Sequence, residues 1–339
     1  MAFLNEYNSE QKQHINLSPV AMSTLENDMI AFSIPTKSGM LNKIIMNYHE
    51  IADASISIRL SDKLNSLRSL LESVPEAYRN QAVELLMDNY KRILLIKSAA
   101  YPDGKGFKFR INNDNMEYLS SDDSCKENQY YPTLGKYLKA LVEEYSRRSF
   151  LEREAIMKSD MLSCLNSSIF ASKQIKIKFG TGKSLRIKPY KIAVDDMQTS
   201  HYLLGIIVSD DLYNNRLTSI RISSIKSIHV LQANSRLKKT EIDKLESAVI
   251  HKGVPFIGKV ETDILVYLND RGKKKYQQLV HLRPAYIKIE NNDFYTFNCS
   301  IDQARFYFYR FGEDAKIIQP KSLALHMKQA HQRAADIYQ

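Results

Sequence analysis

The sequence is poor in the residues and segments that define several protein classes. Only 11 glycines and 9 prolines occur among 339 residues, which excludes collagen-like and low-complexity chains, and a hydrophobic fraction of 44% predicts a folded protein. The longest apolar run, Tyr202 to Val208, has seven residues, far fewer than the ~20 of a membrane-spanning helix. The first residues lack the basic and apolar regions of a secretory signal. We therefore expect a cytoplasmic protein without a membrane segment.

Cysteines and histidines are too few and too scattered to indicate a metal or catalytic centre. The three cysteines, Cys125, Cys164 and Cys299, lack the spacing of metal ligands and are expected to be reduced thiols. The eight histidines are dispersed, and His326 and His331 would not share one face of a helix. Paired aspartates fall in turn-like segments. We expect no metal, no cofactor and no enzymatic activity.

The net charge of +10 is concentrated in the C-terminal half of the chain. Residues 1–100 carry 10 Lys and Arg against 11 Asp and Glu, and residues 101–170 carry the same numbers. Residues 171–339 hold 28 basic and 16 acidic side chains, which accounts for the whole excess. A local excess of this size attracts phosphates. We expect this half to face a polyanion; a solvated basic surface is the alternative.

A strand followed by two helices is predicted near the N-terminus. Residues 13–17 alternate polar and apolar side chains, as a half-buried strand does. Ser18-Pro19 then supplies an N-cap and a favourable first helical residue. Apolar residues recur at helical spacing as far as Phe32, and a second helix begins near Thr36. This order resembles the ribbon-helix-helix family of DNA-binding proteins.

The same pattern returns 43 residues later. Residues 55–60 alternate again, so we predict a second half-fold within residues 1–100, whose strand pairs with residues 13–17 in a two-stranded ribbon. In the family this ribbon lies in the major groove of DNA. The resemblance places four side chains on its outer face: His14, Asn16, Ser57 and Arg59. The alternative is a module that serves only for dimerisation or docking.

Residues 101–170 are predicted to link this module to the basic half. Residues 107–111 and 116–119 lie on either side of an asparagine-rich turn and predict a small hairpin. Amphipathic helices follow Pro132 and Ser149, the second with a capping box between Ser149 and Glu152. Long helices of this kind bridge domains or form dimer contacts, and we expect a homodimer.

Short alternating strands predict a small β-barrel over residues 171–250. Residues 175–179 and 185–189 alternate on either side of Gly180-Thr181-Gly182-Lys183-Ser184. This segment looks like a phosphate-binding loop, but it lacks the first glycine of that motif and opens no helix, so we predict a hairpin turn. Further short strands follow at close spacing, as in small barrels.

Three segments of this region resemble the WYL domain, a Sm-like, SH3-type barrel that binds ligands, several of them nucleic acids. They are Arg186-Ile187-Lys188-Pro189-Tyr190, His201-Tyr202-Leu203 and Arg221-Ile222-Ser223-Ser224-Ile225. The resemblance implies that Arg186, Tyr202 and Arg221 face the ligand. The chain departs from the family in two places: His201 replaces its tryptophan, and Ser224 replaces a second arginine.

Residues 251–339 resemble the extension that follows many WYL domains. The predicted order β-α-β-β-α suits a ferredoxin-like unit, and a terminal helix follows Pro320. The elements are a strand over 259–267, a helix from Asp270, strands over 285–289 and 294–298, and a helix capped by Ser300. The sequence as a whole predicts an α+β, multidomain chain.

Cations and aromatic residues are interleaved in the basic half. Lysines and arginines alternate with apolar residues from Lys176 to Lys191, so about half should project from one face toward a phosphate backbone. Aromatic rings beside guanidinium groups hold unpaired bases, which favours single strands. In the barrel we expect binding by Lys183, Arg186, Lys188, Tyr190, His201, Tyr202 and Arg221. In the extension we expect binding by Arg305, Tyr307, Tyr309 and Arg310, unless these aromatic residues only pack.

The combination of a ribbon-helix-helix-like module, a WYL barrel and its extension resembles the WYL accessory proteins encoded beside type VI-D CRISPR systems. That resemblance implies a non-catalytic protein that binds single-stranded RNA and stimulates the effector, an RNA-guided RNA nuclease. The alternative is a transcription regulator, whose N-terminal module binds a DNA operator while the barrel senses an oligonucleotide.

Overall fold

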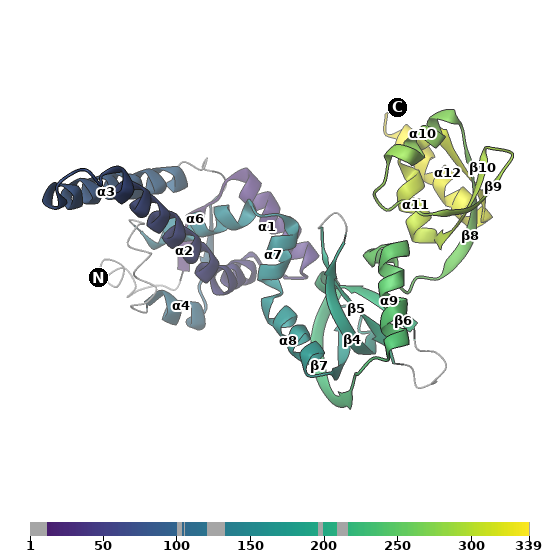
Figure 1. Cartoon of the computed structure of the whole chain (residues 1–339), viewed down its shortest axis with the longest axis horizontal. Helices are drawn as coiled ribbons and strands as arrows, with labels where there is room; N and C mark the ends of the chain where they lie inside the picture. Colours follow the sequence, from purple (N-terminus) through teal and green to yellow (C-terminus); the bar gives the residue numbers. More distant parts are fainter. Residues whose placement is uncertain are drawn as a thin grey trace. The chain divides into compact units, whose positions relative to one another are not determined.

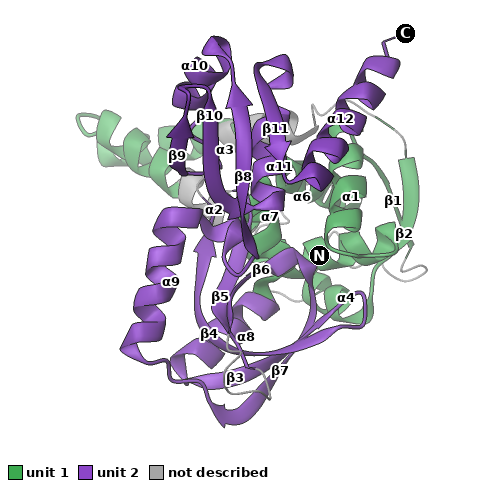
Figure 2. Ribbon diagram, turned by 90° about the vertical axis from the view of Figure 1, so that its right-hand side faces the viewer, with its two compact units in different colours: residues 1–159 green, residues 160–339 purple. Residues whose placement is uncertain are grey.

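A computed structural model describes residues 12–99, 104, 106–120, 133–195, 199–208 and 216–338, except for the side chains of residues 53–60 and 90–99. The chain divides into two compact units, residues 1–159 and residues 160–339 (Figure 2). Helices and antiparallel strands occur in both, which confirms the predicted α+β class. Among the helices that the structure describes, none combines the length and the apolar character needed to cross a membrane.

Unit 1 begins with the predicted strand and two helices. Strand β1 spans Lys12–Asn16, helix α1 Pro19–Ala31 and helix α2 Lys37–Leu70. The hydroxyl of Ser18 caps α1 by accepting a hydrogen bond from the Ala21 amide at 3.2 Å, and the Thr36 hydroxyl caps α2 in the same way.

The second predicted strand is wrong. Residues 55–60 lie inside α2, so Ser57 and Arg59 belong to a helix and not to a ribbon. Helix α2 starts at its Thr36 cap and no proline follows before Pro75. Extending an existing helix is easier than starting a new element, so a short alternating segment stays helical. Strand β1 pairs instead with β2, Gly106–Arg110, in an antiparallel ribbon.

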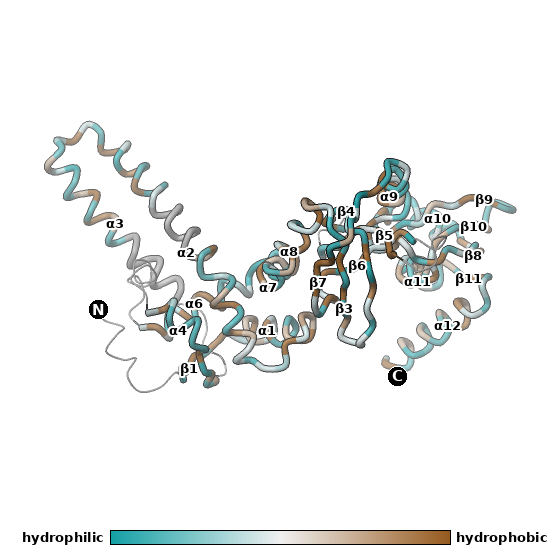
Figure 3. Tube along the Cα trace, turned by 90° about the horizontal axis from the view of Figure 1, so that it is seen from below, coloured by the Kyte–Doolittle hydropathy of each residue, from teal (hydrophilic) through white to brown (hydrophobic). Residues whose placement is uncertain are grey.

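The hairpin predicted over residues 107–119 is wrong in its second half. Residues Asn113–Ser120 form helix α4, because the Asn112 side chain accepts a hydrogen bond from the Asn115 amide at 3.0 Å and caps the helix. The remaining described helices of unit 1 are α3 (Glu76–Ala99), α6 (Leu134–Ser146) and α7 (Phe150–Met157). Helices α2 and α3 form a helical hairpin (Figure 1), with hydrophilic and hydrophobic residues mixed along it (Figure 3).

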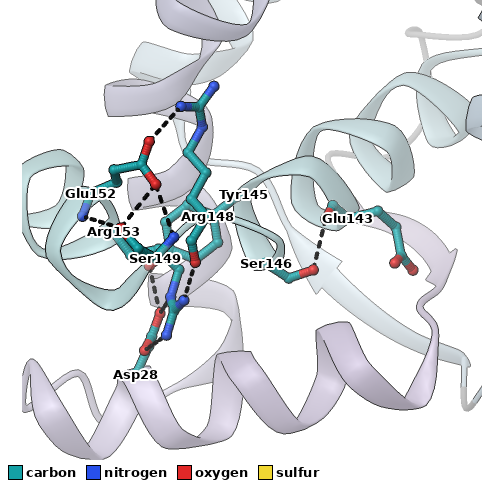
Figure 4. A network of polar contacts seen from close by, with 8 residues as sticks. All are labelled: Asp28, Glu143, Tyr145, Ser146, Arg148, Ser149, Glu152 and Arg153. Atoms are coloured by element: carbon teal, nitrogen blue, oxygen red, sulfur yellow. Dashed lines mark hydrogen bonds and ion pairs between the residues drawn. The ribbon is translucent and has the colours of Figure 1, made fainter. Parts of the chain in front are cut away.

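One hydrophobic core joins both ends of unit 1. It contains residues between Ile15 and Met157, so the helices after residue 133 share it with α1 and α2. A buried ion pair fixes the same helices (Figure 4): Nε of Arg153 donates to Oδ2 of Asp28 at 2.7 Å, and the Tyr145 hydroxyl donates to that oxygen at 2.7 Å. Burial and the Asp28 charge raise the pKa of Tyr145 well above its ordinary value.

Helix α8, Ser159–Phe170, leads into the first sheet of unit 2, which is antiparallel with the strand order β6-β5-β4-β3-β7. The turn between β3 and β4 is the predicted hairpin, in which Gly182 has a φ of 84° that favours glycine. The elements are β3 (Lys173–Phe179), β4 (Ser184–Val194), β5 (His201–Ile207), β6 (Arg216–Arg221), the 3-10 turn η1 (Ile222–Ser224), β7 (Ile225–Asn234) and α9 (Lys239–Lys252).

The second sheet of unit 2 has the strand order β11-β8-β10-β9. Its elements follow the predicted order β-α-β-β-α and add a fourth strand before the terminal helix (Figure 2). They are η2 (Val254–Phe256), β8 (Glu261–Leu268), α10 (Asp270–Gln278), β9 (Tyr286–Glu290), β10 (Phe294–Ser300), α11 (Ile301–Tyr309), η3 (Gly312–Asp314), β11 (Ala315–Gln319) and α12 (Lys321–Asp336). Aromatic residues of β10 and α11, such as Phe297 and Phe308, fill its core.

We expect Arg153→Met to lower the free energy of unfolding of unit 1 by about 3 kcal/mol, because the Asp28 carboxylate would remain buried without its cation. Urea unfolding followed by circular dichroism measures the change. Lys37→Met is the matched control, since the Lys37–Glu26 pair joins α1 to α2 with both side chains at least 40% exposed, and its removal should cost less than about 1 kcal/mol. Equal losses in the two variants would contradict the role given to the buried pair.

Candidate nucleic-acid interface

The first sheet of unit 2 buries one face and directs cations from the other. Ile175 and Ile177 of β3 and Ile187 of β4 are fully buried in a cluster with residues of α8, and they define the inner face. Side chains alternate between the two faces along a strand. Lys176 and Arg186 therefore lie on the outer face, where both are exposed.

Strand register brings cations of three strands into one row on this outer face. Lys176 lies directly opposite Arg186 of β4 and opposite His229 of β7. Lys178 is two residues from Lys176 along β3, and Lys188 is two residues from Arg186 along β4, so both lie on the same face. Like charges opposite each other destabilise a sheet, so an anion bound across them would relieve the repulsion. We call these five residues the cationic row: Lys176, Lys178, Arg186, Lys188 and His229.

A second pair of predicted residues meets further along the same face. Tyr202 of β5 lies directly opposite Arg221 of β6. Lys188 lies opposite Ile206, and Tyr202 is four residues from Ile206 on the same strand. Tyr202 therefore shares the outer face, about 13 Å along β5 from the level of Lys188. The structure brings Tyr202 and Arg221 together but leaves Arg186 at the other end of the face.

Helix α9 covers the part of the outer face that lies between these two ends. Leu204 and Ile206 of β5 pack there in one cluster with Leu245 and Ala248 of α9. Tyr202 also packs against this cluster and is half-buried. The outer face thus divides into a covered apolar part and an uncovered part that carries the cationic row.

Tyr190 is held by α9. Its hydroxyl donates to Oε1 of Glu246 at 2.7 Å, and the Lys191 ammonium donates to the same oxygen at 2.6 Å. The hydrogen bond to Glu246 raises the pKa of Tyr190 to about 12, and Lys191 holds the pKa of Glu246 below its usual range. Tyr190 therefore joins α9 to the sheet instead of offering a free stacking surface.

The other two predicted barrel residues lie apart from the cationic row. Lys183 is exposed in the turn between β3 and β4. His201 is one residue from Tyr202, so alternation directs it to the inner face, where it is half-buried at the end of β5.

The predicted residues of the extension divide between core and surface. Tyr307 is fully buried, and its hydroxyl donates to the Leu279 carbonyl at 2.8 Å. Helical periodicity places it with Phe308 and Phe311 on the side of the core, so Tyr307 cannot stack on a base in this fold. Tyr309 is exposed, and its ring already stacks on His331 with the centroids 4.9 Å apart.

The two arginines of helix α11 lie on the surface with partners inside the extension. Arg305 pairs with Asp302 at 3.3 Å and lies over the ring of Phe306, which is exposed. Arg310 donates to the His281 carbonyl at 2.9 Å. Both guanidinium groups therefore have protein partners, unlike the arrangement expected of a preformed phosphate site.

The β1–β2 ribbon of unit 1 has a second cationic face. Its inner face buries Ile15 and Phe109. Asn16 lies opposite Gly106, where a Cβ atom would come within 2.2 Å of the Asn16 side-chain oxygen, so a larger residue there would displace the Asn16 side chain. The outer face carries two cross-strand pairs of exposed residues: Lys12 opposite Arg110, and His14 opposite Lys108.

The sequence alone did not predict which residues lie opposite each other on neighbouring strands, because the register of strand pairing sets these pairs. His229 is far from Lys176 in the sequence, and pairing of β7 with β3 alone brings them together. Lys108 and Arg110 follow the alternation of β2, which predicts their outward direction, but nothing local indicates that β2 pairs with β1. In the part of the chain that the structure describes, no group of three or more histidine, cysteine or acidic residues is placed to hold a metal ion.

Comparisons with known proteins show a shared fold. No protein-family model and no curated protein sequence matches the chain. A solved structure described as the crystal structure of a CRISPR Cas-related protein is similar, with a TM-score of 0.72 and 22% identity over 96% of this chain and 94% of that chain. Proteasome accessory factor B/C (PafBC) of Arthrobacter aurescens gives a TM-score of 0.32 at 9% identity, over 68% of this chain and 37% of that chain. The first likeness extends over both units and shows their fold.

We expect Tyr307→Phe to destabilise unit 2 by about 1 kcal/mol, because the partly buried Leu279 carbonyl would lose its donor, and to leave nucleic-acid affinity unchanged. Thermal unfolding and an RNA titration on the same protein measure the two effects. Tyr309→Phe is the control, since its exposed hydroxyl has no such partner among the described residues, and it should leave stability unchanged. A loss of RNA affinity in Tyr307→Phe without a loss of stability would contradict the core assignment.

Proposed function

We propose that this chain is a non-catalytic accessory protein of a CRISPR system, which binds single-stranded RNA through the cationic row and stimulates an RNA-guided RNA nuclease of type VI-D. The proposal includes a WYL barrel in residues 171–250 and its ferredoxin-like extension in residues 251–339. It also includes a homodimer in the cytoplasm.

The cationic row is the observation that carries the proposal. Residues 171–194 contain seven lysines and arginines and no acidic residue, and strand alternation exposes Lys176, Lys178 and Arg186 together on one face. Strands β3 and β4 present this charge side by side, about 5 Å apart, which suits a backbone of phosphates, and His229 of β7 lies opposite Lys176. Tyr202 opposite Arg221 adds a ring beside a guanidinium group, a combination that stacks on unpaired bases.

Two further arguments support the biological setting. The similar structure described as a CRISPR Cas-related protein covers almost the whole chain, and a shared fold over both units favours a related setting. The order of the three predicted modules resembles the accessory proteins of type VI-D systems, and that resemblance supplies the expected partner, the effector nuclease.

We expect Lys176→Ala with Arg186→Ala to weaken binding of a fluorescent single-stranded RNA by about tenfold or more. Log K should fall against log salt by roughly 0.7 per phosphate contacted, so the double variant should lose about 1.4 from this slope. Anisotropy titrations at several salt concentrations measure both quantities, and duplex RNA should bind less tightly than the single strand.

The matched control is Lys244→Ala with Lys274→Ala, which removes the same charge from exposed sites on α9 and α10. The control should change the affinity by less than about twofold. The same two proteins are then added to a type VI-D nuclease loaded with guide RNA. Wild type and control should raise the cleavage rate, and the Lys176→Ala, Arg186→Ala variant should not. Equal RNA binding by both double variants would remove the basis of the proposal.

A second candidate function is favoured by the outer face of the β1–β2 ribbon. On this face Lys12 lies opposite Arg110 and Lys108 lies opposite His14, so three lysine and arginine side chains direct charge outward, and Asn16 lies beside them. A two-stranded ribbon of this size fits the major groove of DNA. The alternative is therefore a transcription regulator whose ribbon binds an operator while the sheet of unit 2 senses an oligonucleotide.

If the ribbon reads an operator, one palindromic duplex should bind at least ~1000-fold more tightly than random duplex. Asn16→Ala should then reduce this preference, whereas Lys108→Ala should weaken all duplexes evenly and lower the salt slope by about one. Selection from a random duplex library, followed by titration of the winner, measures the preference. If the selection enriches no sequence, the ribbon has no role in DNA recognition.

A further inference from the structure

A pocket in the C-terminal extension combines an apolar floor with a basic rim. It encloses about 490 Å³ between β11, α11 and α12, a volume within the range of ligand-binding pockets. The floor is formed by Phe308, Ala315, Ile317, Ala324 and Met327, and Leu325, which is 57% exposed, adds to the lining. The rim is formed by Lys316, Lys321, Lys328 and His331.

The lysines of the rim differ from most other lysines of the extension. Lys259, Lys273, Lys275 and Lys288 each form an ion pair with an acidic side chain. The three rim lysines are exposed and form no ion pair with any described residue. Residues 315–335 contain four Lys and Arg and no Asp or Glu, and none of the described residues that line the pocket is acidic. An anionic ligand fits this rim.

The positions of the cations indicate a ligand with several negative groups. Lys321 and Lys328 are two turns apart on α12, or about 10 Å along the helix axis. Lys316 lies on a different element, β11. Their backbone positions are separate, so a ligand that contacts all three lysines without crowding their ammonium groups carries several anionic groups.

The floor indicates an aliphatic or phenyl group. The described lining residues below the rim are hydrocarbon or thioether side chains, so they offer no donor or acceptor to the edge of a nucleobase. A base placed there would lose its hydrogen bonds to water without replacement. A leucine, isoleucine, methionine or phenylalanine side chain forms no hydrogen bonds to water, so it loses none when it enters the floor.

The adjacent strand favours a peptide as the carrier of these groups. Strand β11 is at the edge of its sheet, and its one strand partner among the described residues is β8, so its other backbone edge is unpaired in this part of the chain. Three consecutive residues of β11, Ala315 to Ile317, line the pocket, although successive side chains point to opposite faces. The pocket therefore follows the edge of the strand, where a peptide backbone can add hydrogen bonds that a lipid cannot.

We propose that this pocket binds an acidic peptide segment of a partner protein. A large apolar side chain of the peptide fills the floor, and flanking carboxylates contact Lys316, Lys321 and Lys328. The site is separate from the cationic row, so one chain can hold RNA on the first sheet of unit 2 and a protein on the second.

The test uses the full chain and a random peptide library displayed on phage, which is selected on the wild type. The selected peptides are then tested for binding to Ala324→Phe, in which the new side chain fills the floor. We expect the selected peptides to carry several Asp or Glu residues around Leu, Ile, Met or Phe. A fluorescent copy of the selected peptide should bind Lys321→Glu with Lys328→Glu at least about tenfold more weakly than wild type. Lys274→Glu, an exposed charge reversal on α10, should bind it as wild type does.

Four outcomes would overturn the proposal. The first two are selected peptides without acidic residues and peptides that bind Ala324→Phe as well as they bind the wild type. The third is displacement of the peptide by single-stranded RNA. The fourth is a different mass in solution for the variant Lys321→Glu with Lys328→Glu than for the wild type. The third would make the pocket part of the RNA site, and the fourth would make a second copy its occupant. The RNA titration of the same variants separates this test from the proposed function, because RNA affinity should stay unchanged when peptide affinity is lost.

Discussion

The alternation of isoleucine with lysine or arginine in β3 and β4 is the constraint on which the candidate interface depends. Burial of Ile175, Ile177 and Ile187 fixes the inner face of the sheet. A shift of register by one residue would bury Lys176 and Arg186 and expose the isoleucines. The positions of the cations are therefore set by the hydrophobic core, and the core holds them opposite one another in spite of their repulsion.

Helix α9 decides how much of the outer face remains available. Its apolar residues cover Leu204 and Ile206, and Glu246 fixes Tyr190 and Lys191 to the helix. Sequence alternation predicts which side chains point outward, but it cannot predict that a helix later in the chain returns to cover some of them. Tyr190 and the cationic row therefore follow the same alternation along their strands. Their surroundings differ because α9 holds Tyr190.

Local signals predicted the elements whose ends are chemically marked, such as the Ser18 cap of α1 and the hairpin at Gly182. They failed where one pattern is compatible with two structures. The alternation of residues 55–60 suits a strand, but the helix begun at Thr36 continues through it, and Asn112 begins a helix where an asparagine-rich turn was expected. The pairing of β1 with β2, like that of β3 with β7, is set by contacts distant in sequence and has no local signal.

Net charge locates the basic half of the chain, but pairing determines which of its cations can bind a ligand. In the extension, Asp314 neutralises Lys275 and Asp293 neutralises Lys273, so these lysines add to the count without attracting an anion strongly. The segments over residues 171–194 and 315–335 contain no acidic residue of their own, although Glu246 of α9 pairs with Lys191 in the first. The first segment carries the cationic row on a sheet face, which suits a phosphate chain, and the second surrounds an apolar pocket. The same excess of charge therefore serves two chemically different ligands, and the apolar surface beside the cations distinguishes them.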